Sequence, residues 1–570
     1  MGRYILFVMI IRGPADSLRW LFSSSEGARG RLIPRWIFLR ALAAIYFSAF
    51  FSLLFQIKGL IGPLGILPVQ QYLAAVGDQL GKGALWFAPT LFWLNAGNGM
   101  LMAVTWIGLI ASVAALLNLW PRLSFFICFV CFLSFIGASS IFSSYQSDGM
   151  LLEAGFIALF FAPSGLRPGW GADHPPSRAS LFLLQWEWFR IYFESGLVKL
   201  LSGDVEWRNF TAMDEYYQNG PLPTWVGWYA EHLPHWFHAA SVGATLALEL
   251  VIVFMLFFPR RVRLVCFCIV TPWEIGVILT ANYTFLNYLV LVLGFLLLDD
   301  GYLIRLVPAR FRPAVAEPIA PAEGSSEPSL SILSAGETIS APAEILAPLG
   351  RIKPHNPFRS FATQKKAMRL AVATVFLTLV AYNTTIELIG IPWQSMTQIL
   401  TVPVSLLSPF RIANQYGLFA VMTRGRYEIE FQGSNDGDKW IAYTFRNKPQ
   451  ALNEAPRIYA PYQPRFDWNL WFASLGEWRQ NQFVPLTEER LLVNDADVLA
   501  LFRGNPFSQA PPHYVRAVLW QYWFTSMDEK RRTGNWWTRA WVGIYAPVLT
   551  LSPDGNYSEV QPADELPNHD

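Results

Sequence analysis

Four charged side chains lie close together in an apolar, aromatic stretch before the middle of the chain. Glu187, Arg190 and Glu194 are three and four residues apart, so on a helix they share one face and both carboxylates can reach the guanidinium. Lys199 follows in the same stretch, roughly 120° around the helix. Charges at membrane depth cost on the order of 3 kcal/mol each, and they persist when they pair, line a cavity or do chemistry. The pattern therefore predicts either a buried ionic strut that fixes helix packing or a polar site inside the bilayer.

Two further carboxylates, Asp148 and Glu153, stand at the start of a neighbouring apolar stretch. Carboxylates stabilise helix N-termini by about 0.3–1 kcal/mol, which explains Asp148 as a capping residue. Glu153 lies deeper, and an acid inside an apolar span is a candidate for a functional site. We therefore group both residues with the four charged residues above as one candidate intramembrane polar site.

The composition predicts a polytopic α-helical membrane protein with a soluble part. Of the 570 residues, 53% are hydrophobic and only 15% are charged, well below the roughly 25% of soluble domains. The net charge of +2 argues against a nucleic-acid partner. We expect about nine spans, within a few residues of 36–57, 98–119, 123–142, 150–163, 181–201, 240–258, 264–280, 284–298 and 368–390.

The distribution of basic residues predicts the topology. Residues 1–34 are basic, as are the loops at 259–263 and 365–369, whereas 203–239 is rich in acidic residues. Short basic loops stay in the cytoplasm, so the N-terminus is expected there. With about nine spans the C-terminus then lies in the periplasm or, in a eukaryote, in the lumen of the endoplasmic reticulum.

The chain is expected to divide into five regions. They are a basic cytoplasmic N-terminal segment (1–34), a helical membrane domain (35–300) with an exoplasmic loop (203–239), a cytoplasmic linker (301–366), a last transmembrane helix (367–391) and an exoplasmic C-terminal domain (392–570). The linker is rich in Pro, Ala, Ser and Glu, which predicts disorder around 313–350.

The C-terminal domain carries a hairpin pattern. Residues 426–432 and 440–445 alternate between apolar and polar side chains, and turn-forming residues separate them. The domain is therefore predicted to have an α+β or β-sandwich-like fold.

Three histidines, His232, His235 and His238, recur every three residues after Glu231. Imidazole is a common zinc ligand, so a metal site is one interpretation. Pro234 interrupts the helix, however, and we favour an interfacial amphipathic segment. The four cysteines all lie in apolar runs, which argues against a disulfide framework. The sequence therefore predicts no metal and no cofactor.

Several motifs carry a family resemblance. The stretch FRIYFESGLVKL (189–200), followed by W-R-N-x-T-x-M-D-x-x-Y (207–217), resembles the lipase maturation factor family. So do the segments 145–163, 427–449, 460–478 and 505–516. Such proteins assist folding and assembly of secreted homodimeric lipases into active enzyme. The resemblance implies a membrane-bound, non-enzymatic maturation factor with a secreted, lipase-type client protein as its partner.

The resemblance also implies where the client binds. Aromatic anchors dominate protein interfaces, so exposed side chains of the C-terminal domain are expected to hold the client. The candidate client-binding residues are Arg465, Asp467, Trp468, Trp471, Tyr514 and Arg516.

The loop after Lys199 has an unusual density of aromatic and ionic groups, which we interpret as a lid over a membrane cavity. Arg208 is its expected pivot, because its guanidinium can bind Asp204 or Asp214 bidentately. Trp207 and Tyr217 complete the loop motif.

An enzyme is the alternative. The segment YFESGLVKL is similar to the Y-F-x-A-G-x-x-K-L segment of vitamin K-dependent carboxylases, whose lysine acts as a base. Lys199 matches that lysine, whereas Ser195 replaces the small apolar residue. A lysine desolvated among apolar neighbours loses proton affinity. The resemblance thus implies, as an alternative function, an intramembrane enzyme that acts with a lipid-like cofactor through Lys199. Snorkelling of Lys199 to the interface is the structural interpretation.

Overall fold

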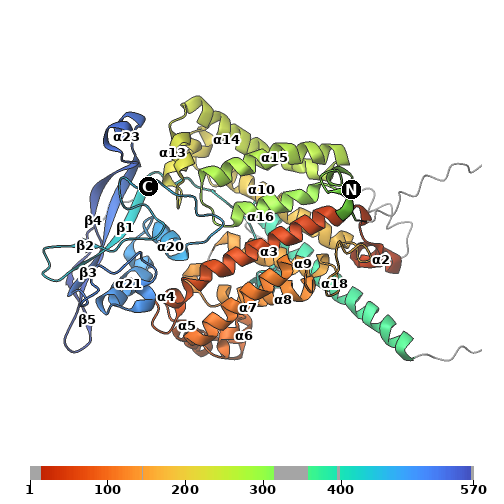
Figure 1. Cartoon of the computed structure of the whole chain (residues 1–570), viewed down its shortest axis with the longest axis horizontal. Coiled ribbons are helices and arrows are strands. Elements are labelled where there is room, and N and C mark those ends of the chain that lie inside the picture. The colour runs from red at the N-terminus through yellow and green to blue at the C-terminus, as the bar shows by residue number, and fades with distance from the viewer. Residues whose placement is uncertain (1–13, 144, 314–356, 394–397, 566–570) are drawn as a thin grey trace, which may run out of the picture.

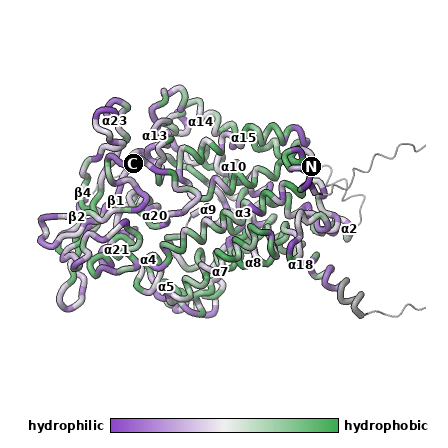
Figure 2. The backbone as a smooth tube through the Cα atoms, viewed as in Figure 1, coloured by the Kyte–Doolittle hydropathy of each residue, from purple (hydrophilic) through white to green (hydrophobic). Residues whose placement is uncertain are grey.

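A helical body and a smaller domain built on a sheet make up the protein (Figure 1). The computed structural model describes residues 14–143, 145–313, 357–393 and 398–565. Nearly all of the linker predicted to be disordered lies outside these residues, as do residues 1–13 of the basic segment. The tube in Figure 2 is coloured as hydrophobic along many helices of the body, whereas hydrophilic and hydrophobic colours are mixed in the smaller domain.

The helical body contains a helix at every predicted span. The helices at these spans are α3 (Leu32–Leu54), α7 (Asn98–Leu116), α8 (Pro121–Ile136), α9 (Gln146–Phe161), α10 (Arg178–Leu201), α14 (His235–Leu250), α15 (Arg260–Thr280), α16 (Leu286–Gly294) and α18 (Pro357–Gly390). The short helix α2 (Pro14–Phe22) precedes them. Short 3-10 turns extend α14 (η6, Ile252–Phe257) and α16 (η7, Phe295–Leu297).

Within the described residues, five of these helices are long and apolar enough to cross a membrane. They are Arg29–Leu54, Asn98–Leu116, His235–Phe257, Arg260–Thr280 and Gln364–Gly390. The remaining predicted spans are shorter or, in α10, carry more charge. The number of about nine spans therefore stays a prediction.

Short helices connect the long ones. Between α3 and α7 lie α4 (Ile57–Ile61), α5 (Val69–Leu80) and α6 (Ala84–Phe87). The predicted exoplasmic loop folds into α11 (Val205–Arg208), α12 (Ala212–Asn219) and α13 (Trp225–Glu231). Side chains cap two of these: Asp204 accepts from the Glu206 amide at 2.9 Å, and Thr224 accepts from the Gly227 amide at 2.9 Å.

The smaller domain contains one antiparallel sheet with the strand order β2-β1-β3-β4-β5. The strands are β1 (Arg426–Ser434), β2 (Ile441–Ala442), β3 (Tyr514–Phe524), β4 (Trp537–Leu551) and β5 (Tyr557–Gln561). The predicted hairpin is confirmed, because β1 pairs with β2 with Gln432 opposite Ala442. The sandwich alternative is wrong for the described residues, since the second layer consists of helices rather than of a second sheet.

The core of this domain lies between the sheet and two helices, α20 (Arg465–Ala473) and α21 (Phe483–Leu492). Alternate residues of β1, Ile429 and Phe431, are fully buried on the helical side, as the alternation in the sequence requires. Gly433 continues this face, where a Cβ atom would lie 2.4 Å from the ring of Phe507, so only glycine fits.

Candidate functional site

Arg190 is the centre of a buried polar cluster between α9 and α10. Its side chain is fully buried and forms an ion pair with Glu153 of α9 through a very short contact. A second carboxylate, Glu194, lies 3.7 Å from Nη1, which also donates to the carbonyl of Asn414 at 2.6 Å. The guanidinium lies 5.1 Å from the ring centroid of Tyr416. These five residues are called the Arg190 socket below.

The segment 411–424, between the helical body and β1, fills this socket. The amide of Asn414 donates to Glu153 at 3.0 Å, and the amide of Tyr416 donates to Glu194 at 2.6 Å. The hydroxyl of Tyr416 donates to Glu153 at 2.9 Å. Glu153 thus accepts from the guanidinium and from two donors of this segment, and Glu194 accepts from one of its amides while lying beside the guanidinium, as buried charges require. The arrangement favours the strut over an open polar site.

Glu187 does not join the socket, so the predicted triad is wrong in one member. The side chain is fully buried, but among the described residues it forms no ion pair within 4.0 Å. Glu153 reaches the guanidinium instead, because α9 packs against this face of α10.

Further along, segment 411–424 contacts the end of α10 and the helix α11. The amide of Leu418 donates to Ser195 Oγ at 3.3 Å, and Trp207 Nε1 donates to the Phe419 carbonyl at 2.9 Å. The Met422 amide donates to Asp204 at 2.5 Å. This segment was not among the predicted site residues. The polar run RIANQYG (411–417), between an apolar helix and a strand, was the available signal.

A second buried ion pair joins the two domains. Arg465 of α20 binds both carboxylate oxygens of Asp148 at 2.8 Å and donates to the Phe142 carbonyl at 2.6 Å. Asp148 lies in the first turn of α9, and both side chains are buried. Two residues that the sequence assigned to different sites thus bind each other.

The expected exposure of the client-binding residues is wrong for four of them. Arg465, Asp467, Trp468 and Trp471 are buried, because α20 lies between the sheet and the helical body. Trp471 Nε1 donates to the Asn219 carbonyl of α12 at 3.1 Å. Tyr514 and Arg516 of β3 are half-buried.

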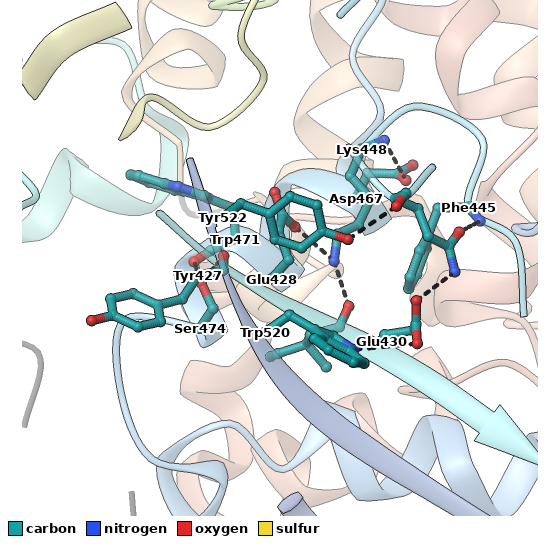
Figure 3. Close-up of polar contacts among 12 residues, drawn as sticks. Tyr427, Glu428, Glu430, Phe445, Lys448, Asp467, Trp471, Ser474, Trp520 and Tyr522 are labelled. Atoms are coloured by element: carbon teal, nitrogen blue, oxygen red, sulfur yellow. Dashed lines mark hydrogen bonds and ion pairs between the residues drawn. The ribbon is translucent and has the colours of Figure 1, made fainter. Parts of the chain in front are cut away.

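Asp467 belongs to a polar network inside the C-terminal domain (Figure 3). Its carboxylate accepts from the Lys448 amide at 3.3 Å. It also accepts from Asn447 Nδ2 at 3.0 Å. Lys448 in turn forms an ion pair with Glu428 of β1 at 2.8 Å. Burial raises the pKa of Asp467, whereas Asn447 and Lys448 oppose this shift. The network fixes the loop 443–450 on the sheet.

Lys199 lies at a cavity of about 390 Å³ and is paired there. Both carboxylate oxygens of Glu249 on α14 accept from its Nζ, at 2.8 and 2.9 Å. The ammonium also lies 5.0 Å from the ring centroid of Trp207. Lys199 is buried, so it does not snorkel to the surface. An ammonium held by a carboxylate is not a free base, and this geometry does not favour the enzyme.

The loop motif lies over this cavity, but Arg208 is not its pivot. Trp207 and Tyr217 line the cavity, as the lid hypothesis requires. Arg208 is exposed and forms no ion pair among the described residues. Asp204 and Asp214 are occupied elsewhere: the first caps α11, and the second binds His235 and His238.

The three histidines do not converge on one point. His235 Nδ1 and His238 Nδ1 lie 2.8 and 2.7 Å from the two oxygens of Asp214. His232 instead lies between the carbonyls of Trp228 and Thr525, at 2.7 and 3.0 Å. In the part of the chain that the structure describes, no group of three or more His, Cys, Asp or Glu residues could hold a metal ion. The metal interpretation is therefore wrong for these histidines.

Comparison with known proteins identifies both domains. A family profile described as the lipase maturation factor transmembrane domain matches residues 33–305, and one described as the lipase maturation factor C-terminal domain matches residues 412–547. The chain belongs to the lipase maturation factor family. The resemblance found in the sequence motifs is thus confirmed.

Curated members of the lipase maturation factor family are similar over most of their length. Lipase maturation factor 2 of Gallus gallus is 32% identical over 94% of this chain and 84% of its own. The Homo sapiens protein of the same name is 31% identical, with coverages of 92% and 83%. Lipase maturation factor 1 of Bos taurus is 30% identical, with coverages of 91% and 89%. No solved structure matches the chain.

The family's C-terminal domain starts within the segment that fills the Arg190 socket. The profile begins at residue 412, and the contacts of Asn414 and Tyr416 with α9 and α10 follow directly. The C-terminal domain of this chain is therefore anchored to the helical body by its own first residues.

Proposed function

We propose that this protein is a membrane-bound maturation factor that assists folding and assembly of a secreted, lipase-type client protein. Membership of the family supports this role, as do the helices long and apolar enough to span a membrane. The observation that carries the proposal is the fastening of the C-terminal domain to the helical body. The Arg190 socket and the Arg465–Asp148 pair hold the sheet in a fixed position at one end of that body, as a platform for a client requires.

The platform faces the exoplasmic side in this proposal. Three arginines lie at the helix ends opposite to those that contact the C-terminal domain. Each donates to a backbone carbonyl there: Arg31 to that of Leu296, Arg122 to that of Ala162 and Arg178 to that of Trp20. The helix α2, at the start of the described residues, also lies at the end of the helical body away from the sheet (Figure 1). Basic helix ends favour the cytoplasm, which supports a bacterial inner-membrane or endoplasmic-reticulum location with the C-terminal domain outside the cytoplasm.

The topology can be tested with fusions. Alkaline phosphatase fused after Asp570 is expected to be active in a bacterial host, and GFP fused at the same point is expected to stay dark. The opposite pattern would mean that the number of spans is even.

The client surface in this proposal is the outer face of the sheet around Arg516. Its guanidinium lies 3.9 Å from the ring centroid of Trp440 and 5.5 Å from that of Trp541. Trp541 is 45% exposed, and its ring lies against Trp520 with a centroid distance of 5.1 Å. Stacked tryptophan and arginine side chains are the residues most often found at the energetic centres of protein interfaces.

The test is recovery of the client with variants of this surface. The tagged full-length protein is purified from its native membrane, and co-purifying secreted proteins are identified by mass spectrometry. Arg516→Ala and Trp541→Ala are expected to lower client recovery about tenfold each, as for interface anchors. The matched control is Trp236→Ala, because Trp236 is 70% exposed but lies on the helical body. Equal recovery with all three variants would contradict a client site on the sheet.

A further inference from the structure

The cavity beside Lys199 has the size and lining of a ligand site. It lies between α10, α14, α15 and α16 under α12, and its volume of about 390 Å³ falls within the range of about 300–1,000 Å³ usual for small-molecule pockets. Most of its lining is aliphatic or aromatic, including Ile191, Phe237, Val277 and Val290. Such a lining excludes strongly hydrated ligands and favours a molecule with an apolar chain.

The cavity opens sideways between α14 and α15. The first of these helices packs on α10 and the second on α16, and they approach each other mainly through η6 at one end. Of the lining residues, Phe237 on α14 and Pro272 and Gly276 on α15 are exposed on the outer surface. Both helices lie in segments long and apolar enough to span a membrane. The opening therefore faces the region where lipid chains would lie.

The inner wall holds an acceptor without a donor. Glu274 of α15 accepts from the hydroxyl of Tyr192 at 2.5 Å and from Asn287 Nδ2 at 2.6 Å. These contacts orient the Asn287 amide. Asn287 is only 8% exposed, and its buried Oδ1 has no hydrogen-bond partner among the described residues. A buried acceptor of this kind is normally paired, so a donor from a ligand would satisfy it.

Charge selects the class of ligand. Lys199 is the cation among the lining residues, and Glu249 neutralises it, so the described lining offers no unpaired cation to an anionic head group such as a phosphate or a fatty-acid carboxylate. A neutral hydroxyl group can instead donate to Asn287 Oδ1.

We propose that this cavity binds a neutral, hydroxyl-bearing lipid that enters from the bilayer between α14 and α15. Its hydrocarbon part lies against the apolar lining, and its hydroxyl donates to Asn287 Oδ1. Acylglycerols and sterols share this chemistry, and the experiment distinguishes them. The site is independent of the client surface on the sheet.

The test uses the full-length protein in phosphatidylcholine nanodiscs that contain a photoreactive lipid. One arm carries a diazirine-bearing monoacylglycerol, and another carries a diazirine-bearing sterol. Labelled peptides are identified by mass spectrometry. At least one probe is expected to label the lining residues on α14, α15 and α16, and the probe that does so identifies the source.

Gly276 offers a matched pair of variants. A Cβ atom at this position meets no heavy atom within 4 Å, so the backbone accepts a side chain there. Gly276→Trp fills the opening and is expected to lower labelling of the lining about tenfold, the change expected when a site is overfilled. Gly276→Ala leaves the opening free and is expected to keep the labelling of the unaltered protein.

A second comparison tests the hydroxyl. The methyl ether of the labelling probe cannot donate, so it is expected to label about tenfold less, in line with the loss of one hydrogen bond to a buried acceptor. Asn287→Leu is expected to remove the difference between the two probes, and thermal unfolding confirms that it is folded. The proposal is overturned by equal labelling of Gly276→Trp and Gly276→Ala, by labelling only at outward residues such as Ala244 and Ala247, or by equal labelling with the methyl ether.

Discussion

The helix α10 carries two buried charged sites that differ in what faces them. At Arg190 the partners come from three parts of the chain: Glu153 from α9, Glu194 from α10 itself, and Asn414 and Tyr416 from segment 411–424. At Lys199, further along the same helix, the charged partner is a single carboxylate on α14, and the ammonium otherwise lies near the rings of Trp207 and Phe419 at the wall of a cavity. Both cations are buried to the same degree, so burial does not distinguish them.

The difference separates a structural role from a site with room for a ligand. In the Arg190 socket, backbone amides donate to the carboxylates, so the ions fix the path of a segment and hold two domains together. Around Lys199 no chain segment occupies the cavity, and removing the ions would free volume without leaving backbone donors unpaired. An intramembrane charge thus acquires a functional interpretation from the empty space beside it, rather than from its burial.

The largest effect is expected from Arg190→Ala. This substitution leaves Glu153 and Glu194 buried near each other without a cation, and breaking a buried ion pair on one side costs about 3–5 kcal/mol. We expect low abundance and loss of the folded protein. Membrane expression level and thermal unfolding in detergent measure this.

The control for this experiment is Arg208→Ala. Arg208 is an exposed arginine just beyond the same helix, and its substitution is expected to change stability by no more than about 0.5 kcal/mol. Normal abundance and an unchanged melting profile of Arg190→Ala would contradict the strut.

A smaller but more discriminating effect is expected when each ion pair is replaced by apolar residues of similar size. Lys199→Met with Glu249→Leu removes both charges, and such replacements are often neutral or stabilising. Arg190→Met with Glu153→Leu removes one ion pair but leaves Glu194 buried without its cation. It also leaves the Asn414 amide and the Tyr416 hydroxyl without their acceptor. Each unpaired buried donor costs about 1–3 kcal/mol, so the second double variant is expected to be less stable.

Thermal unfolding of the two double variants tests the comparison directly. Equal stability would mean that segment 411–424 gains nothing from the carboxylates. If the Lys199→Met/Glu249→Leu variant keeps its stability but loses client maturation, the enzyme alternative regains support.

The sequence predicted the elements better than the partners. Hydropathy located the helices at every expected span, and alternation located the β1–β2 hairpin, because both patterns are local. The spacing of Arg190 and Glu194 correctly predicted an ion pair within one helix turn.

Long-range pairing could not be predicted in the same way. The partner of Asp148 is Arg465, more than three hundred residues later, and the partner of Lys199 is Glu249 on another helix. Local spacing predicted Glu187 as a partner of Arg190, but tertiary packing brings Glu153 to that guanidinium. It also predicted Asp204 as a partner of Arg208, which the fold leaves exposed. The tryptophans of α20 had the composition of an interface, and they form one with the helical body of the same chain.

A pH effect is expected at Glu231, in the helix α13 beside the cavity. Burial, together with the charges of Glu215 and Asp214, raises the pKa of Glu231 to about 8. The unfolded chain ionises near the ordinary value of about 4.3, so between about pH 4.5 and 8 the folded state binds more protons. Stability is therefore expected to fall as the pH rises through this window.

Glu231→Gln removes this dependence. We expect the variant to match the unaltered protein at pH 5 and to exceed it at pH 8 by roughly 1–2 kcal/mol, after discounting for partial exposure. Thermal unfolding at the two pH values measures the difference. A fall of stability between pH 5 and 8 that persists in the variant would assign the effect to another group.

The smallest effect is expected from Arg208→Lys, which tests whether the lid depends on the planar guanidinium of Arg208. The guanidinium is exposed and has no ion pair among the described residues, so losing its planar fork removes no contact. Surface substitutions of this kind change stability by no more than about 0.5 kcal/mol.

The lid is instead fixed through Trp207, whose Nε1 donates to the Phe419 carbonyl. Trp207→Phe keeps an aromatic ring but loses that hydrogen bond and part of the buried indole, at an expected cost of at least about 1 kcal/mol. The melting temperatures of both variants test which contact fixes the lid, and Trp207→Phe is expected to lower the melting temperature more. If Arg208→Lys lowers it more, the lid depends on a contact of the guanidinium and not on segment 411–424.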